Sequence, residues 1–371
     1  MKIIVAVDSF KNALRAKFAA QAVSDGWLAV RPQDEVIPLP MSDGGEGLCD
    51  ALTLAGQGRF LNIPTVDAFM RPRSGRVGIV GGCAILESAE ANGIELLRAD
   101  ELDPLKATTF GVGIMLKELL TTHKCRRVII GIGGSATVDG GAGMLQALGC
   151  RFFDADGTEL PPGIGGGDLS KIVRMERSAL NGLLDGVEIA VACDVNNILC
   201  GENGSAAVFG PQKGATPEMV KILDDNLKYF AALHDDSGMS AGDGAAGGLG
   251  FALRTIGGRM ESGAKLVMKE NGFFEKLSGA DLVITGEGCS DNQTACGKLC
   301  SEIAIAAKSR GVPTVLLSGA LKGDCADLEK LFAGCFSISR GVCTLEEALK
   351  NTAVNLEKAA GSLAAYAKAF R

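Results

Sequence analysis

Short apolar runs that end in polar or glycine-rich loops recur along the chain. Lys2–Val7 is followed by DSFK, and Glu35–Leu39 is followed by PMSDGGEG. Runs of this length between loops indicate buried strands. Later runs of the same kind are Val128–Ile130, Val187–Cys193, Leu282–Thr285, Val312–Leu317 and Cys335–Ile338. Because stretches with helical spacing, such as Ala13–Val30 and Phe110–Leu120, lie between them, the chain is predicted to alternate strands and helices.

This pattern predicts two α/β domains. From Leu61 to Ser88 the helical spacing gives way to short β-like pieces, which indicates an insertion. We therefore expect a Rossmann-like domain with a parallel sheet, formed by residues 1–62 and 282–371. A smaller inserted α/β domain would span residues 63–281, with the active site in the cleft between the two. A length of 371 residues suits two domains.

Two local signals predict turns and caps. Asp156-Gly157 lies within a hairpin-like stretch, CRFFDADGTELPPG. Thr344 and Glu347 have capping-box spacing and predict the start of a single final helix.

Composition excludes several classes of partner. The net charge is −7, and the chain has one Trp and two Tyr, which is unfavourable for binding nucleic acid or an anionic membrane. No apolar run approaches the roughly 20 residues of a membrane span, and the N-terminal run is too short for a signal peptide. We expect a cytoplasmic monomer or homodimer that acts on a small molecule, with no nucleic-acid or membrane partner.

Cysteine and histidine offer little catalytic chemistry. The twelve cysteines are scattered without a C-x-x-C pair, which indicates free thiols in a reducing compartment. His123 and His234 each lie where a helix is predicted to end, and we expect both to be solvated there. Acid–base work is therefore expected to fall to carboxylates.

The most informative loop is RVIIGIGGSATVDGGAGMLQALG, residues 127–149. Glycines allow backbone N–H groups to surround an anion, and the following helix directs its positive end to the same place. Ser135 and Thr137 add hydroxyl donors. Asp139 would repel a phosphate unless Mg²⁺ or a hydroxyl group stood between them. The loop therefore favours a nucleotide triphosphate bound with a metal ion, although a plain strand-to-helix turn remains the alternative.

Acidic side chains follow several predicted strands. Asp8, Asp43, Asp194 and Glu287 each lie just past an apolar run. In an open parallel sheet, ligands collect at the carboxyl ends of strands. Asp243 precedes a second glycine-rich helix start. Helix capping and turn formation are the structural alternatives for Asp43 and Asp194.

Two other functions fit parts of this pattern. Gly131–Ala136 matches the loose dinucleotide motif G-x-G-x-x-A, so an NAD(P)-dependent dehydrogenase of a small hydroxy acid is the alternative enzyme, with Asp154 or Asp156 on the ribose. A nucleotide-binding regulator would retain the glycine loops without requiring acids at four strand ends.

Taken together, the motifs resemble the class I bacterial glycerate kinases, of the glycerate 2-kinase type, over nearly the whole chain. The matching segments are DSFKNALRA, PMSDGGEG, GIGGSATVDGGAGMLQALG, ACDVNNILCGENGSAAVFGPQKGAT, GAAGGLGFAL and ITGEGCSDNQTACGK. The resemblance implies a two-domain α/β kinase that transfers the γ-phosphoryl group of ATP to D-glycerate, giving 2-phosphoglycerate and ADP. This chain has Cys289 where the family generally has Arg, and Leu48 where it usually has Thr.

These considerations give a hypothesis for the site, with ATP and Mg²⁺ as cofactors. Asp194, Asp43 and Lys11 are expected to be catalytic, with the base either Asp43 or Asp194. Glycerate is expected to contact Ser9, Lys11, Ser42 and Asp43, with Lys11 facing its carboxylate. The residues expected to bind the nucleotide are Gly133, Gly134, Ser135, Thr137, Gly140, Gly141, Lys213, Glu287 and Lys298. Asp194 is the first metal ligand, with Asp139 or Asp243 as second contributors.

Overall fold

The computed structural model describes residues 1–291, 294, 298–323 and 325–369. They form two compact units: unit 1 comprises residues 1–43, 50–57 and 264–371, and unit 2 comprises residues 44–49 and 58–263. The sequence placed the second boundary at 281/282, whereas residues 264–281 belong to unit 1. The inserted unit was expected to be the smaller one, but it contains the greater part of the chain.

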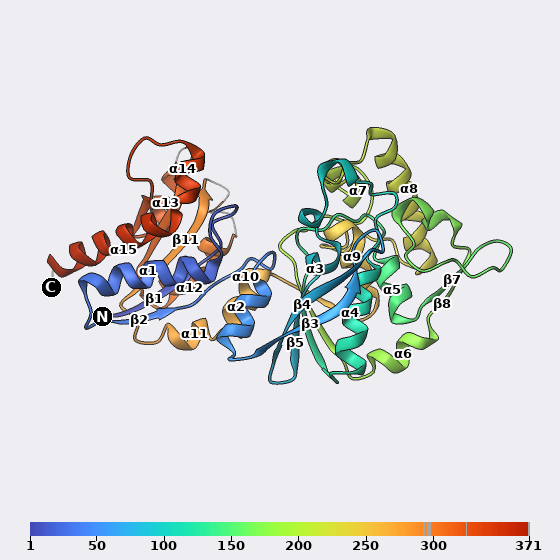
Figure 1. The fold of residues 1–371 in the computed structure, drawn as a ribbon, viewed down its shortest axis with the longest axis horizontal. Coiled ribbons are helices and arrows are strands. Elements are labelled where there is room, and N and C mark those ends of the chain that lie inside the picture. Colours follow the sequence, from blue (N-terminus) through green and yellow to red (C-terminus); the bar gives the residue numbers. More distant parts are fainter. Residues whose placement is uncertain (292–293, 295–297, 324, 370–371) are drawn as a thin grey trace. The chain divides into compact units, whose positions relative to one another are not determined.

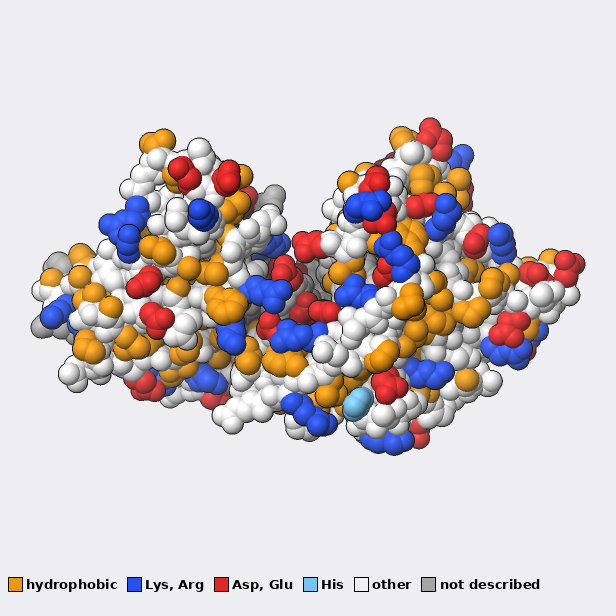
Figure 2. All heavy atoms as spheres, in the orientation of Figure 1, with side chains coloured by type: hydrophobic (Ala, Val, Ile, Leu, Met, Phe, Trp, Pro, Cys, Tyr) orange, Lys and Arg blue, Asp and Glu red, His pale blue; other side chains and the backbone are white. Residues whose placement is uncertain are grey.

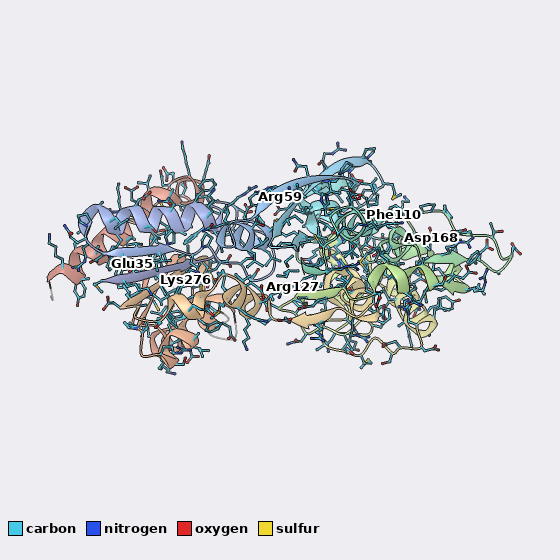
Figure 3. The ribbon with its side chains drawn as sticks, turned by 90° about the horizontal axis from the view of Figure 1, so that it is seen from below. Glu35, Arg59, Phe110, Arg127, Asp168 and Lys276 are labelled. Atoms are coloured by element: carbon cyan, nitrogen blue, oxygen red, sulfur yellow. The ribbon has the colours of Figure 1, made fainter. Side chains whose placement is uncertain are left out.

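Unit 1 is built on a five-stranded parallel sheet with the order β13-β12-β11-β1-β2. In chain order this is the 2-1-3-4-5 arrangement of doubly wound, flavodoxin-like sheets, and the winding direction reverses between β1 and β11. The strands are β1 (Lys2–Val7), β2 (Glu35–Pro38), β11 (Leu282–Ser290), β12 (Thr314–Leu321) and β13 (Gly334–Ser337). Figure 3 labels Glu35 at the start of β2.

Helices cover both faces of this sheet. One face packs against α1 and α15, in a core that includes Trp27, Ile284 and Leu356. Figure 1 shows these two helices side by side. A Cβ on Gly26 of α1 would lie 2.0 Å from the carbonyl oxygen of Glu357 in α15, so only glycine permits this close approach of the helices. The other face packs against α12 and α13. The helices assigned mainly to unit 1 are α1 (Ala16–Val30), α2 (Leu48–Ala55), α10 (Gly263–Glu270), α11 (Phe273–Lys276), α12 (Leu299–Ser309), α13 (Ala326–Leu331), α14 (Leu345–Lys350) and α15 (Thr352–Ala369).

Unit 2 contains a six-stranded sheet with the order β10-β9-β6-β5-β4-β3. The first four are parallel, and β4 and β3 are added as antiparallel strands at one edge. The strands are β3 (Arg59–Val66), β4 (Pro72–Val80), β5 (Cys83–Glu87), β6 (Arg127–Gly131), β9 (Glu188–Ala192) and β10 (Arg259–Glu261). A separate pair joins β7 (Arg151–Phe153) to β8 (Arg174–Glu176).

The core of unit 2 is one apolar cluster that joins this sheet to its helices. The α-helices are α3 (Ala89–Asn92), α4 (Phe110–Thr121), α5 (Ala142–Leu148), α6 (Ser178–Leu184), α7 (Ser205–Phe209), α8 (Pro217–Leu233) and α9 (Leu249–Thr255). Short 3₁₀ turns are η1 (Ile94–Leu96), η2 (Ala99–Glu101), η3 (Gly166–Lys171), η4 (Pro211–Lys213) and η5 (Ala245–Gly248).

On the face drawn in Figure 2, basic and acidic side chains are interspersed over both units.

Three local features of the structure differ from their predictions. The Asp156-Gly157 turn forms, but β7 pairs with β8 rather than mainly with the strand after the turn. The capping box at Thr344 and Glu347 is present, yet its helix α14 ends at Lys350 and a second helix follows. β11 extends to Ser290, well past the apolar run.

No helix among the described residues is long and apolar enough to cross a membrane.

Candidate functional site

The reversal point of the unit 1 sheet brings together acidic side chains from β11 and from the segments that follow β1 and β2. Asp8 follows β1 directly, and its backbone N–H donates to the carbonyl of Gly286 in the neighbouring β11, at 2.9 Å. Glu287 is the next residue of β11, and Asp43 belongs to the segment after β2. Because ligands of doubly wound sheets bind at this reversal point, the three carboxylates occupy the expected binding position of unit 1.

Asp8 is the most perturbed of these acids. Burial raises the pKa of its carboxyl group to about 8, and the negative charges of Asp43 and Glu287 act in the same direction. The backbone N–H of Ser9, which donates to Asp8 Oδ1 at 2.6 Å, and the ammonium group of Lys11 partly oppose the shift. A carboxyl group with a pKa in this range can accept or release a proton near neutral pH.

The predicted glycerate ligands lie around this acidic group. Ser9 is half-buried, Lys11 is exposed and Ser42 is fully buried. The end of β11 packs tightly on this segment, because a Cβ on Gly288 would lie 3.2 Å from the backbone nitrogen of Lys11. Unit 1 therefore brings Ser9 and Lys11 together with Asp43 and Glu287.

Two predicted nucleotide ligands also lie in unit 1. Glu287 is half-buried, and its Oε1 accepts hydrogen bonds from Ser290 Oγ at 2.9 Å and Thr294 Oγ1 at 2.8 Å. Lys298 is exposed and is the N-cap residue of α12. Cys289, which replaces the arginine expected from the family pattern, is exposed on β11.

In unit 2, the glycine-rich loop after β6 divides into an exposed part and a buried part. Figure 3 labels Arg127, where β6 begins. Gly133 and Gly134 are exposed, and Gly134 has a φ of 71°. Ser135 and Thr137 are buried, and Thr137 Oγ1 accepts a hydrogen bond from Asn92 Nδ2 at 3.0 Å. The accessible surface of the predicted phosphate loop is therefore its first half.

Lys213 supports this loop from within the unit. Its side chain is buried, and Nζ donates to Ser135 Oγ at 2.8 Å and to the carbonyl oxygen of Thr137 at 2.7 Å. Burial lowers the pKa of Lys213 to about 7, while the nearby Asp139 acts in the opposite direction. The prediction grouped Lys213 with Ser135 and Thr137, and the structure joins all three by hydrogen bonds.

Asp139 has the geometry of a structural residue. Its carboxylate is fully buried and accepts from the N–H and hydroxyl groups of Thr109, both at 2.7 Å, and from the N–H groups of Gly141 and Gly143. These four bonds fasten the start of α5 to α4. Burial raises the pKa of this carboxyl group. The saturated carboxylate favours a structural role over the predicted metal role.

Gly140 and Gly141 are also packed in the interior rather than open to a ligand. A Cβ on Gly140 would lie 3.0 Å from the ring of Phe230, and one on Gly141 would lie 2.3 Å from Cβ of Ala252. Since the first N–H groups of α5 already bind Asp139, this geometry does not support the predicted phosphate contact at the helix start.

The predicted metal ligands are not gathered at one place. Asp243 is buried in a bidentate ion pair with Arg254, at 2.6 and 3.0 Å, which favours a structural role. Asp194, after β9, is exposed, and its Oδ1 accepts a hydrogen bond from the N–H of Gly263 at 2.9 Å. Within the described parts of the chain, no three His, Cys, Asp or Glu side chains lie close enough to hold a metal. Asp194 remains the accessible candidate.

Two residues differ from the expectations of the sequence. Asp8 was noted only as one of several strand-end acids, although a parallel strand ending directly in Asp was the available signal. His234 caps α8 as expected, but it is half-buried against Phe230 and Phe251, and burial lowers its pKa to about 4. The expectation of a solvated imidazole was wrong for His234.

The dehydrogenase alternative is not favoured. Asp154, one of its proposed ribose ligands, uses Oδ1 to accept hydrogen bonds from the N–H groups of Asp156 and Thr158 and so shapes the β7 turn.

Similarity to known proteins extends over the full length. A sequence model of the glycerate kinase family matches residues 3–368. The chain is 41% identical to a glycerate kinase of Bacillus subtilis, covering 99% of this chain and 98% of the relative, and 38% identical to a glycerate 2-kinase of Escherichia coli, covering 98% and 97%. The crystal structure of a putative glycerate kinase 2 from Salmonella typhimurium superposes with a TM-score of 0.88 at 39% identity, covering 100% of this chain and 98% of that one. On these grounds the chain belongs to the glycerate kinase family.

Proposed function

We propose that this protein transfers the γ-phosphoryl group of ATP to D-glycerate, giving 2-phosphoglycerate and ADP. The observation that carries the proposal is the gathering of Asp8, Asp43 and Glu287 at the reversal point of the unit 1 sheet, in a chain of the glycerate kinase family. Phosphoryl transfer requires positioning, neutralisation of charge and an acceptor for the hydroxyl proton, and this group supplies the last of these.

We assign the triphosphate to the exposed half of the glycine-rich loop. Gly133 and Gly134 lack side chains and are open to solvent, which supports close approach of phosphate oxygens to the backbone. Ser135 and Thr137 hold the loop through Lys213, so this lysine acts as a positioning residue behind the phosphates. Lys298, exposed at the start of α12, remains a second candidate for contact with the nucleotide.

We assign D-glycerate to the segment after β1. Lys11 is exposed and would pair with the substrate carboxylate, while Ser9 offers a hydroxyl group beside it. Ser42 is buried, so its contribution would be to hold the segment that carries Asp43. Lys11 lies close enough to Asp8 to lower that residue's pKa, which supports placing the reactive hydroxyl near the acids.

The proton acceptor in this proposal is the Asp8–Asp43 pair. A new bond forms between the glycerate C2 oxygen and the γ-phosphorus, and the bond between that phosphorus and the β–γ bridging oxygen breaks. The hydroxyl proton passes to the carboxylate of Asp8, and ADP leaves with the bonding electrons. The raised pKa of Asp8 suits a general base, whose optimal pKa lies near the working pH.

Asp194 is the residue that would hold Mg²⁺. Mg²⁺ is commonly bound through one or two carboxylates together with substrate phosphates, so a single accessible carboxylate fits this chemistry. Bound there, Mg²⁺ would neutralise phosphate charge. Asp139 and Asp243 are not retained, because both carboxylates are buried and already hydrogen-bonded.

The direct test is to incubate the protein with D-glycerate, ATP and Mg²⁺ and to identify the product by ³¹P NMR. We expect ADP and 2-phosphoglycerate in equal amounts. Formation of 3-phosphoglycerate would contradict the assigned hydroxyl, and absence of ADP would contradict the kinase proposal. A Cys289→Arg variant, which restores the residue of the family pattern, controls for weak activity caused by this substitution.

A further inference from the structure

Unit 1 contains a cavity that lies apart from the acidic reversal point. It has a volume of about 560 Å³ and is lined by residues of β12, β13, the segment after β13, and α15. The lining includes none of Asp8, Asp43 or Glu287. This volume lies in the range of small-molecule sites, and the cavity reaches the carboxyl end of one parallel strand, β13, where ligands bind in such sheets.

The cavity has an apolar floor with aromatic walls. Leu317 and Ile338 are buried beneath it, whereas Phe336 and Tyr366 are 44% and 67% exposed. Ile338 is held in place because its N–H donates to the carbonyl of Ser318 at 2.8 Å. Two partly exposed rings beside a fixed apolar floor offer a surface for a flat apolar group, since aromatic rings bury large areas on stacking.

The charge at the cavity has one sign. Arg340 and Lys358 both line it, and none of the described side chains in the lining is Asp or Glu. Within the described residues, neither cation has an ion-pair or side-chain hydrogen-bond partner. Cationic groups without a counter-charge create a positive potential that attracts anions, and a concave surface concentrates that potential.

We propose that this cavity binds a small aromatic anion, with the ring against Phe336 and Tyr366 and the acidic group at Arg340 and Lys358. A nucleotide of the proposed reaction and an unrelated aromatic carboxylate or phosphate share this chemistry. The site is distinct from the glycine-rich loop of unit 2, so it adds a ligand site to those of the proposed reaction.

The test uses a matched pair of fluorescent probes. 1-Anilinonaphthalene-8-sulfonate is an aromatic anion, and N-phenyl-1-naphthylamine is its uncharged counterpart. Both are titrated into the wild type, an Arg340→Gln/Lys358→Gln double variant and a Lys308→Gln/Lys350→Gln control. The control loses the same charge at two exposed lysines outside the cavity. Melting temperatures verify that all three proteins are folded.

We expect saturable binding of the anionic probe by the wild type and the control, weakened about tenfold or more in the cavity variant. The uncharged probe should bind all three proteins equally. Equal affinity of the anionic probe for both variants, or no saturable binding by the wild type, would overturn the proposal. Metal-free ADP distinguishes the sources: competition that is lost in the cavity variant identifies a nucleotide, whereas failure to compete identifies another aromatic anion.

Discussion

Asp8 lies directly after β1. Its pKa is raised to about 8, chiefly by burial and to a smaller extent by the negative charge of Asp43. If its carboxylate accepts the substrate proton, kcat/KM rises with pH through about 8 and then levels off. An Asp8→Asn variant should lose about 10²- to 10⁴-fold in kcat. The measurement is the pH–rate profile at saturating ATP.

The neighbouring charge provides a control for this prediction. In an Asp43→Asn variant, one source of the raised pKa of Asp8 is removed, so the inflection of kcat/KM should move to lower pH. An inflection that stays in place in Asp43→Asn, or a fully active Asp8→Asn, would remove Asp8 from proton transfer.

Lys213 gives a prediction about stability. Its pKa is about 7 in the folded protein against an ordinary 10.5, so between these values the unfolded chain binds more protons. This residue's contribution to the free energy of unfolding should therefore rise as pH increases from about 7 to 10.5, and its penalty should be fully present below pH 7. Urea unfolding of wild type and Lys213→Met across this range measures the difference. Identical slopes in both proteins would show that the buried ammonium group is not destabilising.

At the level of elements, the loop between β6 and α5 combines two kinds of glycine. Gly134 is exposed, and an added Cβ would approach only Ala89, at 3.8 Å. Gly141 is buried, and an added Cβ would overlap Ala252. Sequence alone could not separate these two glycines, because both occur in G-G pairs. The structure gives both a positive φ, so backbone conformation does not separate them either.

Alanine at these two positions should therefore have different consequences. Gly134→Ala should cost about 1 kcal/mol of stability for its positive φ and should raise the KM for ATP. Gly141→Ala should cost an additional 1–3 kcal/mol or so for overpacking. Urea unfolding and ATP titrations measure both effects. Equal loss of stability in the two variants would contradict the division of the loop into exposed and buried halves.

Asp194 and Asp139 form a second contrast between strand-end acids. Asp194→Asn should preserve the hydrogen bond from Gly263 and the melting temperature, yet lower kcat by orders of magnitude and change the dependence on Mg²⁺. Asp139→Asn places an amide among N–H donors in the interior and should cost about 1–3 kcal/mol of stability. Near-normal turnover of Asp194→Asn would remove this residue from the mechanism.

The elements themselves were largely predictable, since the apolar runs of β1, β9 and β12 and the spacing in α4 reflect burial on a sheet. The buried acids were not. Asp139 and Asp243 have the same strand-end or helix-start context as Asp194, and only the partners supplied by Thr109 and Arg254 distinguish them. Thr109 lies 30 residues from Asp139 in the sequence, and Arg254 lies 11 residues from Asp243. The local sequence pattern around each acid therefore does not reveal its partner.

For the whole molecule, the insertion was visible because helical spacing stops after Leu61. Its far boundary was misplaced because α10 and α11 continue the helical pattern without a break in composition, although they belong to unit 1. The reversal point between β1 and β11 joins segments separated by the entire insertion, so the gathering of Asp8 with Glu287 required the structure.

The central proposal is that main-chain N–H groups of an exposed glycine loop, together with a carboxylate-bound Mg²⁺, hold the phosphates of ATP. The most direct measurement is a crystal structure of the protein with Mg²⁺ and the non-hydrolysable analogue AMP-PNP. We predict that the terminal phosphates contact residues 133–135 and that Mg²⁺ is coordinated by Asp194. Terminal phosphates bound away from this loop, with Asp194 remote from the metal, would contradict the proposal.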